Sequence, residues 1–175
     1  MIVPVQNIVE TVDLTADDVL LPMMECIVNS VISLQQSDKP KDEKIIQIKI
    51  IRGSSPKQTN FDNIKTIDSI IITDNGIGFN KKNYKSFETP FSKINKEFGC
   101  KGIGRFTVLA AFENLSARSN YFEDGEWHYR EFEFNSNDEL KPIELKISDK
   151  QESKTTVELS NCFNEIIKEN ISSFN

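Results

Sequence analysis

The sequence predicts an α+β protein, a two-layer sandwich in which helices cover one face of a mixed, mostly antiparallel sheet. The apolar pattern gives a helix, two strands, a loop, a second helix and then a run of strands. A doubly wound parallel sheet would need strands and helices to alternate to the end of the chain, and here they do not. A length of 175 residues with 38% hydrophobic residues fits a single domain, residues 1–175, with its own core.

The first long element is a helix over residues 19–34. Pro22 fits a first helical turn better than a helix interior, and Thr15 with Asp17 or Asp18 is a candidate cap. Apolar residues recur at helical spacing and predict a buried stripe. That stripe comprises Leu20, Met24, Ile27, Val28 and Val31.

Two strands follow, over residues 45–51 and 66–73. The run IIQIKII is rich in β-branched residues and has Gln47 and Lys49 as its polar face, and TIDSIIIT ends at Asp74. The polar stretch between these two runs is predicted to be a loop.

The rest of the chain returns mainly to strands. Residues 74–104 are predicted to be mostly loop, with a short helix over 81–87, and a helix opened by glycine follows over 105–112. Three or four strands come next, near residues 114–121, 126–134, 141–148 and 155–160. A closing amphipathic helix over 161–172 has one apolar face, made of Phe163, Ile166, Ile167 and Ile171.

Composition excludes several classes of protein. The chain has 21 basic and 27 acidic residues, a net charge of −6, so no positive field indicates nucleic-acid binding by this domain. No apolar run approaches the roughly 18 residues of a membrane-spanning helix. Three cysteines without a CxxC pair favour a reducing, cytoplasmic location over a disulfide framework. The single histidine, His128, leaves little material for histidine-based catalysis.

Glycines are concentrated in one part of the sequence. Five of the seven, at 76, 78, 99, 102 and 104, lie between Asp74 and Arg105. Such clusters occur where backbone passes close to a ligand or takes positive φ. The run GCKGIGR is not a P-loop, because Arg105 and Phe106 stand where Lys and Ser or Thr are required, and GxGxxG fails because position 81 is Lys.

The first helix carries a candidate polar pair. Glu25 and Asn29 are four residues apart, so they project from one side of that helix, at the margin of its apolar stripe. A half-buried carboxylate and amide need a polar partner, and a metal–nucleotide complex would be one. On its own, such a pair is more often a surface feature.

Taken in order, the motifs MECIVN, ITDNGIGF, GCKGIGRF and KTTVEL resemble those of the GHKL ATPases. This superfamily includes the DNA gyrase B subunit, the ninety-kilodalton heat-shock chaperones, sensor histidine kinases and mismatch-repair MutL proteins. Each motif alone is weak, but the ordered set spans roughly residues 20–160. The resemblance implies the GHKL fold, with ATP and Mg²⁺ as cofactors.

The resemblance also implies a role for each residue at the adenine. Asp74 would accept a hydrogen bond from the adenine amine, and Gly78 would let the base lie against backbone. Gly76 would be a further nucleotide-binding residue. Thr155 would hold the water that bridges Asp74 and adenine. Lys154 stands where the family has glycine, so the choice between Thr155 and Thr156 stays open.

At the phosphates, Glu25 would be the general base for the attacking water, and Asn29 would bind Mg²⁺ through its amide oxygen. Residues 79–104 would form a lid over the nucleotide. The remaining phosphate contacts implied by the resemblance are Gly99, Lys101, Gly102, Gly104 and Arg105.

The implied function is Mg²⁺-dependent ATP binding with slow hydrolysis, as a conformational switch in a multidomain protein. Details resemble MutL proteins and chaperones, and GIGRFTVLAAFENL resembles bacterial GHKL proteins of phage defence. We expect the chain to be the N-terminal part of a longer protein. Its partners would be ATP or ADP, downstream domains and a second copy in a nucleotide-dependent homodimer. The alternatives are the catalytic domain of a histidine kinase and a non-catalytic nucleotide-binding domain.

Overall fold

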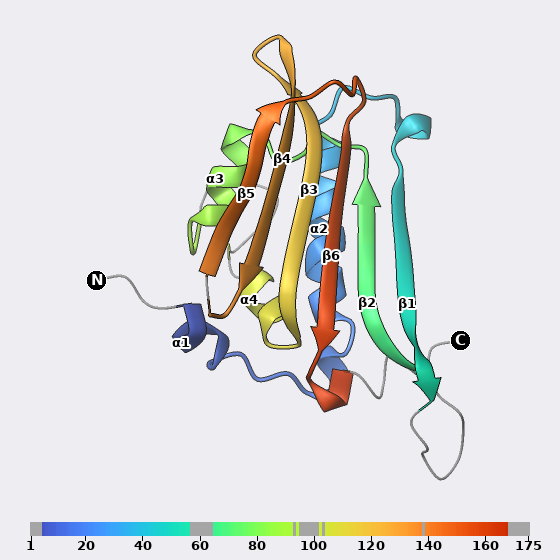
Figure 1. Ribbon diagram of the computed structural model, residues 1–175, viewed down its shortest axis with the longest axis vertical. Coiled ribbons are helices and arrows are strands. Elements are labelled where there is room, and N and C mark those ends of the chain that lie inside the picture. The colour runs from blue at the N-terminus through green and yellow to red at the C-terminus, as the bar shows by residue number, and fades with distance from the viewer. Residues whose placement is uncertain are drawn as a thin grey trace.

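A computed structural model describes most of the chain, and the sheet and helices within it follow the predicted order (Figure 1). The described residues are 5–56, 65–92, 94, 102, 104–137 and 139–167. Among them no helix is long and apolar enough to cross a membrane.

The strands are β1 (Ile46–Pro56), β2 (Lys65–Asp74), β3 (Phe112–Glu123), β4 (Glu126–Asn135), β5 (Glu139–Ile147) and β6 (Lys154–Cys162). The helices are α1 (Val5–Val9), α2 (Leu21–Gln35), α3 (Lys81–Glu88) and α4 (Gly104–Leu109), with short 3-10 turns η1 (Ala16–Asp18) and η2 (Lys41–Glu43). The chain therefore folds into α+β structure, as the sequence predicts.

The six strands form one sheet in the order β1-β2-β6-β3-β4-β5. Each neighbouring pair of strands is antiparallel, so the predicted mixed character is wrong for the described residues. The last strand, β6, lies between β2 and β3 and joins the β1–β2 hairpin to the β3–β4–β5 meander. The position of β6 thus brings distant parts of the sequence together.

The helices cover one face of this sheet, where the core lies (Figure 1). Alternate residues of the central strands point to that face, because successive side chains of a strand point to opposite sides. The ones almost completely buried include Ile70, Ile72, Leu115, Ala117, Phe132, Phe134 and Leu159. From the helix layer, Phe106 of α4 packs against Phe134, and Phe87 of α3 packs against both Phe132 and Phe134.

The predicted buried stripe of the first helix is largely wrong. Ile27 packs against the core, but four members of the stripe are 39–42% exposed: Leu20, Met24, Val28 and Val31. The helix instead buries Cys26 and Ser30. Spacing alone could not show this, because the side of α2 that turns inward is partly polar.

Three element boundaries also differ from the predictions. Thr15 precedes η1 and not α2, and its backbone N–H and hydroxyl both donate to the Asp18 carboxylate. Phe112 begins β3 and pairs with Cys162 of β6. Because β6 continues to Cys162, the predicted helix over 161–172 is helical only at residues 165–167, and residues 168–172 lie outside the described part.

Candidate functional site

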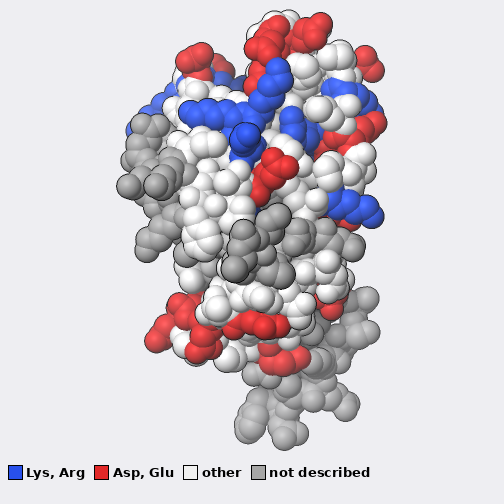
Figure 2. All heavy atoms as spheres, turned by 90° about the vertical axis from the view of Figure 1, so that its left-hand side faces the viewer, with Lys and Arg blue, Asp and Glu red and all other residues white. Residues whose placement is uncertain are grey.

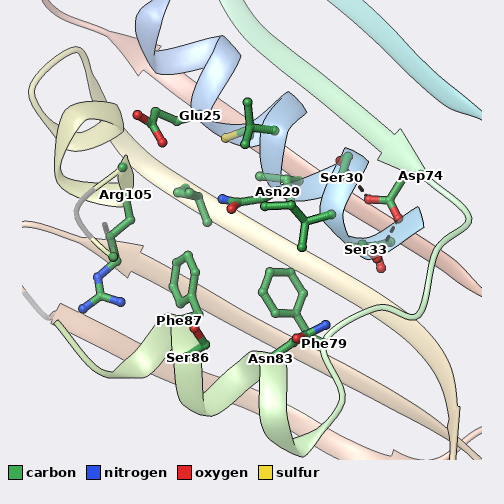
Figure 3. Close-up of a pocket in the computed structure, with 18 of the residues that line it drawn as sticks. Glu25, Asn29, Ser30, Ser33, Asp74, Phe79, Asn83, Ser86, Phe87 and Arg105 are labelled. Atoms are coloured by element: carbon green, nitrogen blue, oxygen red, sulfur yellow. Dashed lines mark hydrogen bonds between the residues drawn. The ribbon is translucent and has the colours of Figure 1, made fainter. Parts of the chain in front are cut away.

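A pocket of about 490 Å³ lies between α2, α3, α4 and the sheet (Figure 3). This volume is within the roughly 300–1,000 Å³ usual for small-molecule sites. Apolar residues form much of its wall: Leu21, Met24, Val28, Ile32, Phe79, Phe87, Leu115 and Val157. Asp74 lies towards one end of α2, whereas Glu25 and Arg105 lie towards the other (Figure 3).

At the first end, the chain itself holds the Asp74 carboxylate. Asp74 is only 4% exposed. Its Oδ2 accepts a hydrogen bond from the Ser30 hydroxyl at 2.8 Å. Its Oδ1 accepts one from the Gly76 backbone N–H at 2.9 Å and one from the Ser33 hydroxyl at 3.3 Å. The carboxylate is therefore fixed in position by three donors from two separate elements.

These contacts leave part of the Asp74 carboxylate for a ligand. Two carboxylate oxygens offer about four acceptor positions, and the described donors use three of them. Burial raises the pKa of Asp74, while the Gly76 N–H and the two serine hydroxyls act in the opposite direction. A ligand that donates a hydrogen bond at Oδ2 would further favour the ionised form.

Strand pairing decides which threonine faces the pocket. Thr155 lies directly across from Asp74, is 4% exposed and lines the pocket. Its hydroxyl is 2.9 Å from that of Ser119. Thr156 points to the opposite face of the sheet, where its hydroxyl lies 3.2 Å from that of Thr73. The pocket threonine is thus Thr155.

Gly78 lines the pocket beside Thr155. Its φ of +69° is a left-handed conformation that side chains rarely adopt. A Cβ at this position would lie 2.5 Å from the Ser119 Oγ and 3.2 Å from the Thr155 Oγ1. Only glycine fits here, so the turn after Asp74 can lie directly against β3 and β6.

At the other end, Glu25 and Asn29 line the pocket from α2, with Glu25 half-buried and Asn29 exposed. Gly104, the first residue of α4, lies against Glu25, and a Cβ at Gly104 would overlap the Glu25 carboxylate. Because Gly104 has no side chain, the Glu25 carboxylate can lie directly against the first residue of α4.

Arg105 lines the same end and is 9% exposed. Its guanidinium lies 4.7 Å from the Phe106 ring centre, and its Nη2 is 3.5 Å from the Glu88 carbonyl oxygen. No carboxylate of the described residues pairs with it, and its buried Nε has no hydrogen-bond partner among them. Burial lowers the pKa of Arg105 to about 10, so the side chain keeps its charge at neutral pH.

The remaining predicted site residues are placed as follows. Gly102 lines the pocket. Gly76 donates its backbone N–H to Asp74 and packs against the backbone of Ser33. Gly99 and Lys101 lie outside the described residues. Of the predicted lid, residues 79–104, the part that forms α3 packs against β4 through Phe87 and Tyr84.

Sequence reasoning missed several residues around Asp74, among them Ser30, Ser33 and Ser119. A signal for one of them exists, because Ser33 continues the four-residue spacing of Glu25 and Asn29 along the same helix. Ser119 carries no such signal. Its hydroxyl accepts from the Phe79 backbone N–H at 2.9 Å only because β3 lies beside β6 in the folded sheet.

His128 packs across the strands. It lies opposite Tyr121, with ring centres 5.5 Å apart, and its Nε2 is 3.3 Å from the Glu123 carbonyl oxygen. The described residues contain no cluster of three or more His, Cys, Asp or Glu side chains that could hold a metal ion. A metal here would depend on other ligands.

Comparison with known proteins assigns no family to the chain. It matches no protein-family model, and no curated protein is significantly similar to it in sequence.

Proposed function

We propose that this chain is a GHKL-type ATPase domain that binds ATP with Mg²⁺ and hydrolyses it slowly, as a conformational switch of a multidomain protein. One observation carries the proposal. Residues from four motifs that are well separated along the sequence line one pocket. They are Glu25, Asn29, Asp74, Gly78, Gly102, Gly104, Arg105 and Thr155. The two-layer α+β arrangement is compatible with the GHKL fold.

The buried end of the pocket suits adenine. Asp74 is a fixed acceptor with room for one more donor, and the exocyclic amine of adenine is such a donor. Guanine carries a carbonyl oxygen at that position. This oxygen would face the Asp74 carboxylate without a hydrogen between them, so guanine would be disfavoured. The apolar side chains of Ile32, Leu115 and Val157 offer contact to the flat faces of the base.

The other end suits phosphate. Arg105 is a buried cation with no carboxylate partner in the described part of the chain, and leaving a buried charge uncompensated is costly. A phosphate group would supply the missing negative charge in bidentate form. Asn29 would contribute an amide oxygen to Mg²⁺, which usually takes only one or two protein ligands together with substrate phosphates and water. Bound there, Mg²⁺ would neutralise charge on the phosphates.

Glu25 is the residue best placed to activate water. Its carboxylate lies at the phosphate end and is positioned by Gly104. As a general base it would take a proton from water while the water oxygen bonds to the γ-phosphorus and the bond to the β–γ bridging oxygen breaks. ADP and inorganic phosphate would be the products.

The deciding experiment is calorimetric titration with the non-hydrolysable imido analogue of ATP, with and without Mg²⁺. We expect saturable binding that Mg²⁺ strengthens. Asp74→Asn should weaken it by roughly 10- to 100-fold, because a hydrogen bond to a charged group contributes about 1.5–3 kcal/mol. Asp68→Asn is a matched control, since Asp68 lies on the same strand with an exposed side chain. No binding at millimolar analogue, or equal effects of the two variants, would refute the proposal.

A further inference from the structure

The edge strand β5 carries an apolar row that no part of the described chain covers. Ile143, Leu145 and Ile147 are 49%, 62% and 58% exposed. Leu145 lies opposite Arg130 of β4, and Ile147 lies opposite His128. Directly paired residues point to the same face of a sheet. Leu145 and Ile147 therefore lie on the face that the helices cover elsewhere, beyond the edge of their cover. Ile143, beside a register shift in the β4–β5 pairing, falls on the same face by alternation from Glu144.

Within the described part of the chain β5 pairs with β4 alone, so the backbone groups on its other side have no strand partner there. Proteins usually protect open edges with charges, prolines or short strands. Pro142 protects the beginning of β5, but the segment of residues 143–147 after it has only apolar side chains on the helix-side face. An exposed apolar edge of this kind is a site for adding another strand.

We propose that the partner is a second copy of this chain, whose β5 pairs antiparallel with the first β5 about a two-fold axis at Leu145. In that register Ile143 lies opposite the second copy's Ile147. On the other face, Glu144 lies opposite the second copy's Lys146, and by symmetry the pairing occurs twice. Within one copy these two side chains already form an ion pair at 2.9 Å, so the dimer would contain four alternating charges.

The charges also select this register over its neighbours. A shift by one residue would place apolar side chains opposite charged ones, on the wrong face. A shift that moves the axis to Glu144 would set two Glu144 carboxylates against each other, and an axis at Lys146 would do the same with two ammonium groups. Like charges directly opposite are unfavourable. Self-complementarity is therefore strongest with the axis at Leu145.

The opposite edge of the sheet lacks this property. On β1, Ile48 and Ile50 are also exposed, at 46% and 36%. The polar residues that alternate with them, Gln47 and Lys49, include no acid. Two copies of β1 would have no opposite charges to align, so the argument for self-pairing applies to β5 alone.

The charge distribution around β5 favours the same partner. Figure 2 views the molecule from the β5 side, with basic side chains gathered in the upper half, among some acidic ones, and acidic side chains at the lower end. Helix α3, in the upper half of Figure 1, carries the exposed Lys81, Lys82 and Lys85, and the exposed Glu10, Asp13 and Asp17 follow α1, which lies towards the lower end. Antiparallel pairing would place the upper half of each copy beside the lower end of the other.

Sedimentation equilibrium of the chain without nucleotide tests this proposal independently of the ATPase proposal. We expect a concentration-dependent monomer–dimer equilibrium that weakens with added salt. Glu144→Lys would make all four charges positive, and Lys146→Glu would make them negative. Each variant should weaken the dimer by about tenfold or more, since two favourable cross-strand pairs become repulsive. The double variant Glu144→Lys, Lys146→Glu should restore it.

Lys49→Glu on β1 is the matched control, because it changes the net charge as Lys146→Glu does and lies on the other edge. It should leave the dimer unchanged. Thermal unfolding would establish that every variant is folded at the temperature used. A chain that is monomeric at all concentrations would overturn the proposal. So would a dimer whose affinity is unchanged by either single charge reversal, or a failure of the double variant to restore the affinity.

Discussion

The two ends of the pocket differ in where their polar groups find partners. At one end, Asp74 receives three hydrogen bonds from its own chain, from Ser30, Ser33 and Gly76. At the other end, the buried Arg105 has one long contact to a carbonyl oxygen and no carboxylate partner among the described residues. At the first end the chain itself supplies three hydrogen bonds to the charged group, whereas the second end has a charge that a ligand would balance.

This difference teaches that one pocket can combine a polar group fixed by its own chain with another whose charge the described residues leave unbalanced. Buried polar groups need partners, and a protein supplies them where it fixes a geometry in advance. Substitutions at the Asp74 end should therefore affect binding of adenosine and of the triphosphate alike. Substitutions at the Arg105 end should affect only ligands that carry phosphate, or only turnover.

The largest effect is expected for Glu25→Gln. The amide has nearly the shape of the carboxylate but cannot take a proton from water, so ATP hydrolysis should fall by roughly 10²- to 10⁴-fold. Affinity for the imido analogue should stay within a few-fold. Phosphate-release assays and calorimetry measure the two quantities, and Glu126→Gln, at the exposed first residue of β4, is the control. Hydrolysis at the parent rate would exclude Glu25 as the base.

A pair of glycine substitutions separates the two ends. Gly78→Ala should lower the free energy of unfolding by about 1–3 kcal/mol, because alanine is strained at positive φ and its Cβ meets Ser119. Gly104→Ala should leave stability nearly unchanged, since only the flexible Glu25 side chain must move. The displaced carboxylate should still slow hydrolysis by up to about 10²-fold. Urea unfolding and turnover measure both, and equal stability losses would contradict this comparison.

Arg105→Met sharpens the comparison by ligand. We expect affinity for the imido analogue to fall by about tenfold, because a charge-assisted contact is lost, while affinity for adenosine stays unchanged. Arg130→Met is the matched control, since Arg130 is also a buried guanidinium among aromatic rings but does not line the pocket. Calorimetry with both ligands gives the answer. An equal loss of affinity for adenosine would show that Arg105 does not act through the phosphates.

The smallest effect is the pH dependence at the Asp74 end. Because burial raises the pKa of Asp74, its protonated form favours the folded state. The free energy of unfolding of the parent, relative to that of Asp74→Asn, should therefore fall as pH rises from the unfolded value of 3.8 towards the higher folded one. Adenosine affinity should change in the opposite sense, since the acceptor must be ionised. Denaturant titrations and calorimetry between pH 4 and 7 test both.

Much of this fold could be predicted from local patterns. The predicted strands that end at Asp74 and contain Thr155 match the observed ones to within a residue or two, because both runs are rich in β-branched residues. The environment of the apolar stripe of α2 could not be predicted. Periodicity shows that one stripe is apolar, but in this chain Met24 and Val28 of that stripe line the pocket and are 42% exposed.

The sequence by itself determined the fold class and the order of the elements, because these depend on neighbours along the chain, and its four motifs indicated part of the pocket lining. Only the tertiary structure decided that β6 lies between β2 and β3. That insertion puts Thr155 opposite Asp74, turns Thr156 away and brings Ser119 to the turn at Gly78. The physical reason is that strand order is set by contacts between distant segments, which no local pattern encodes.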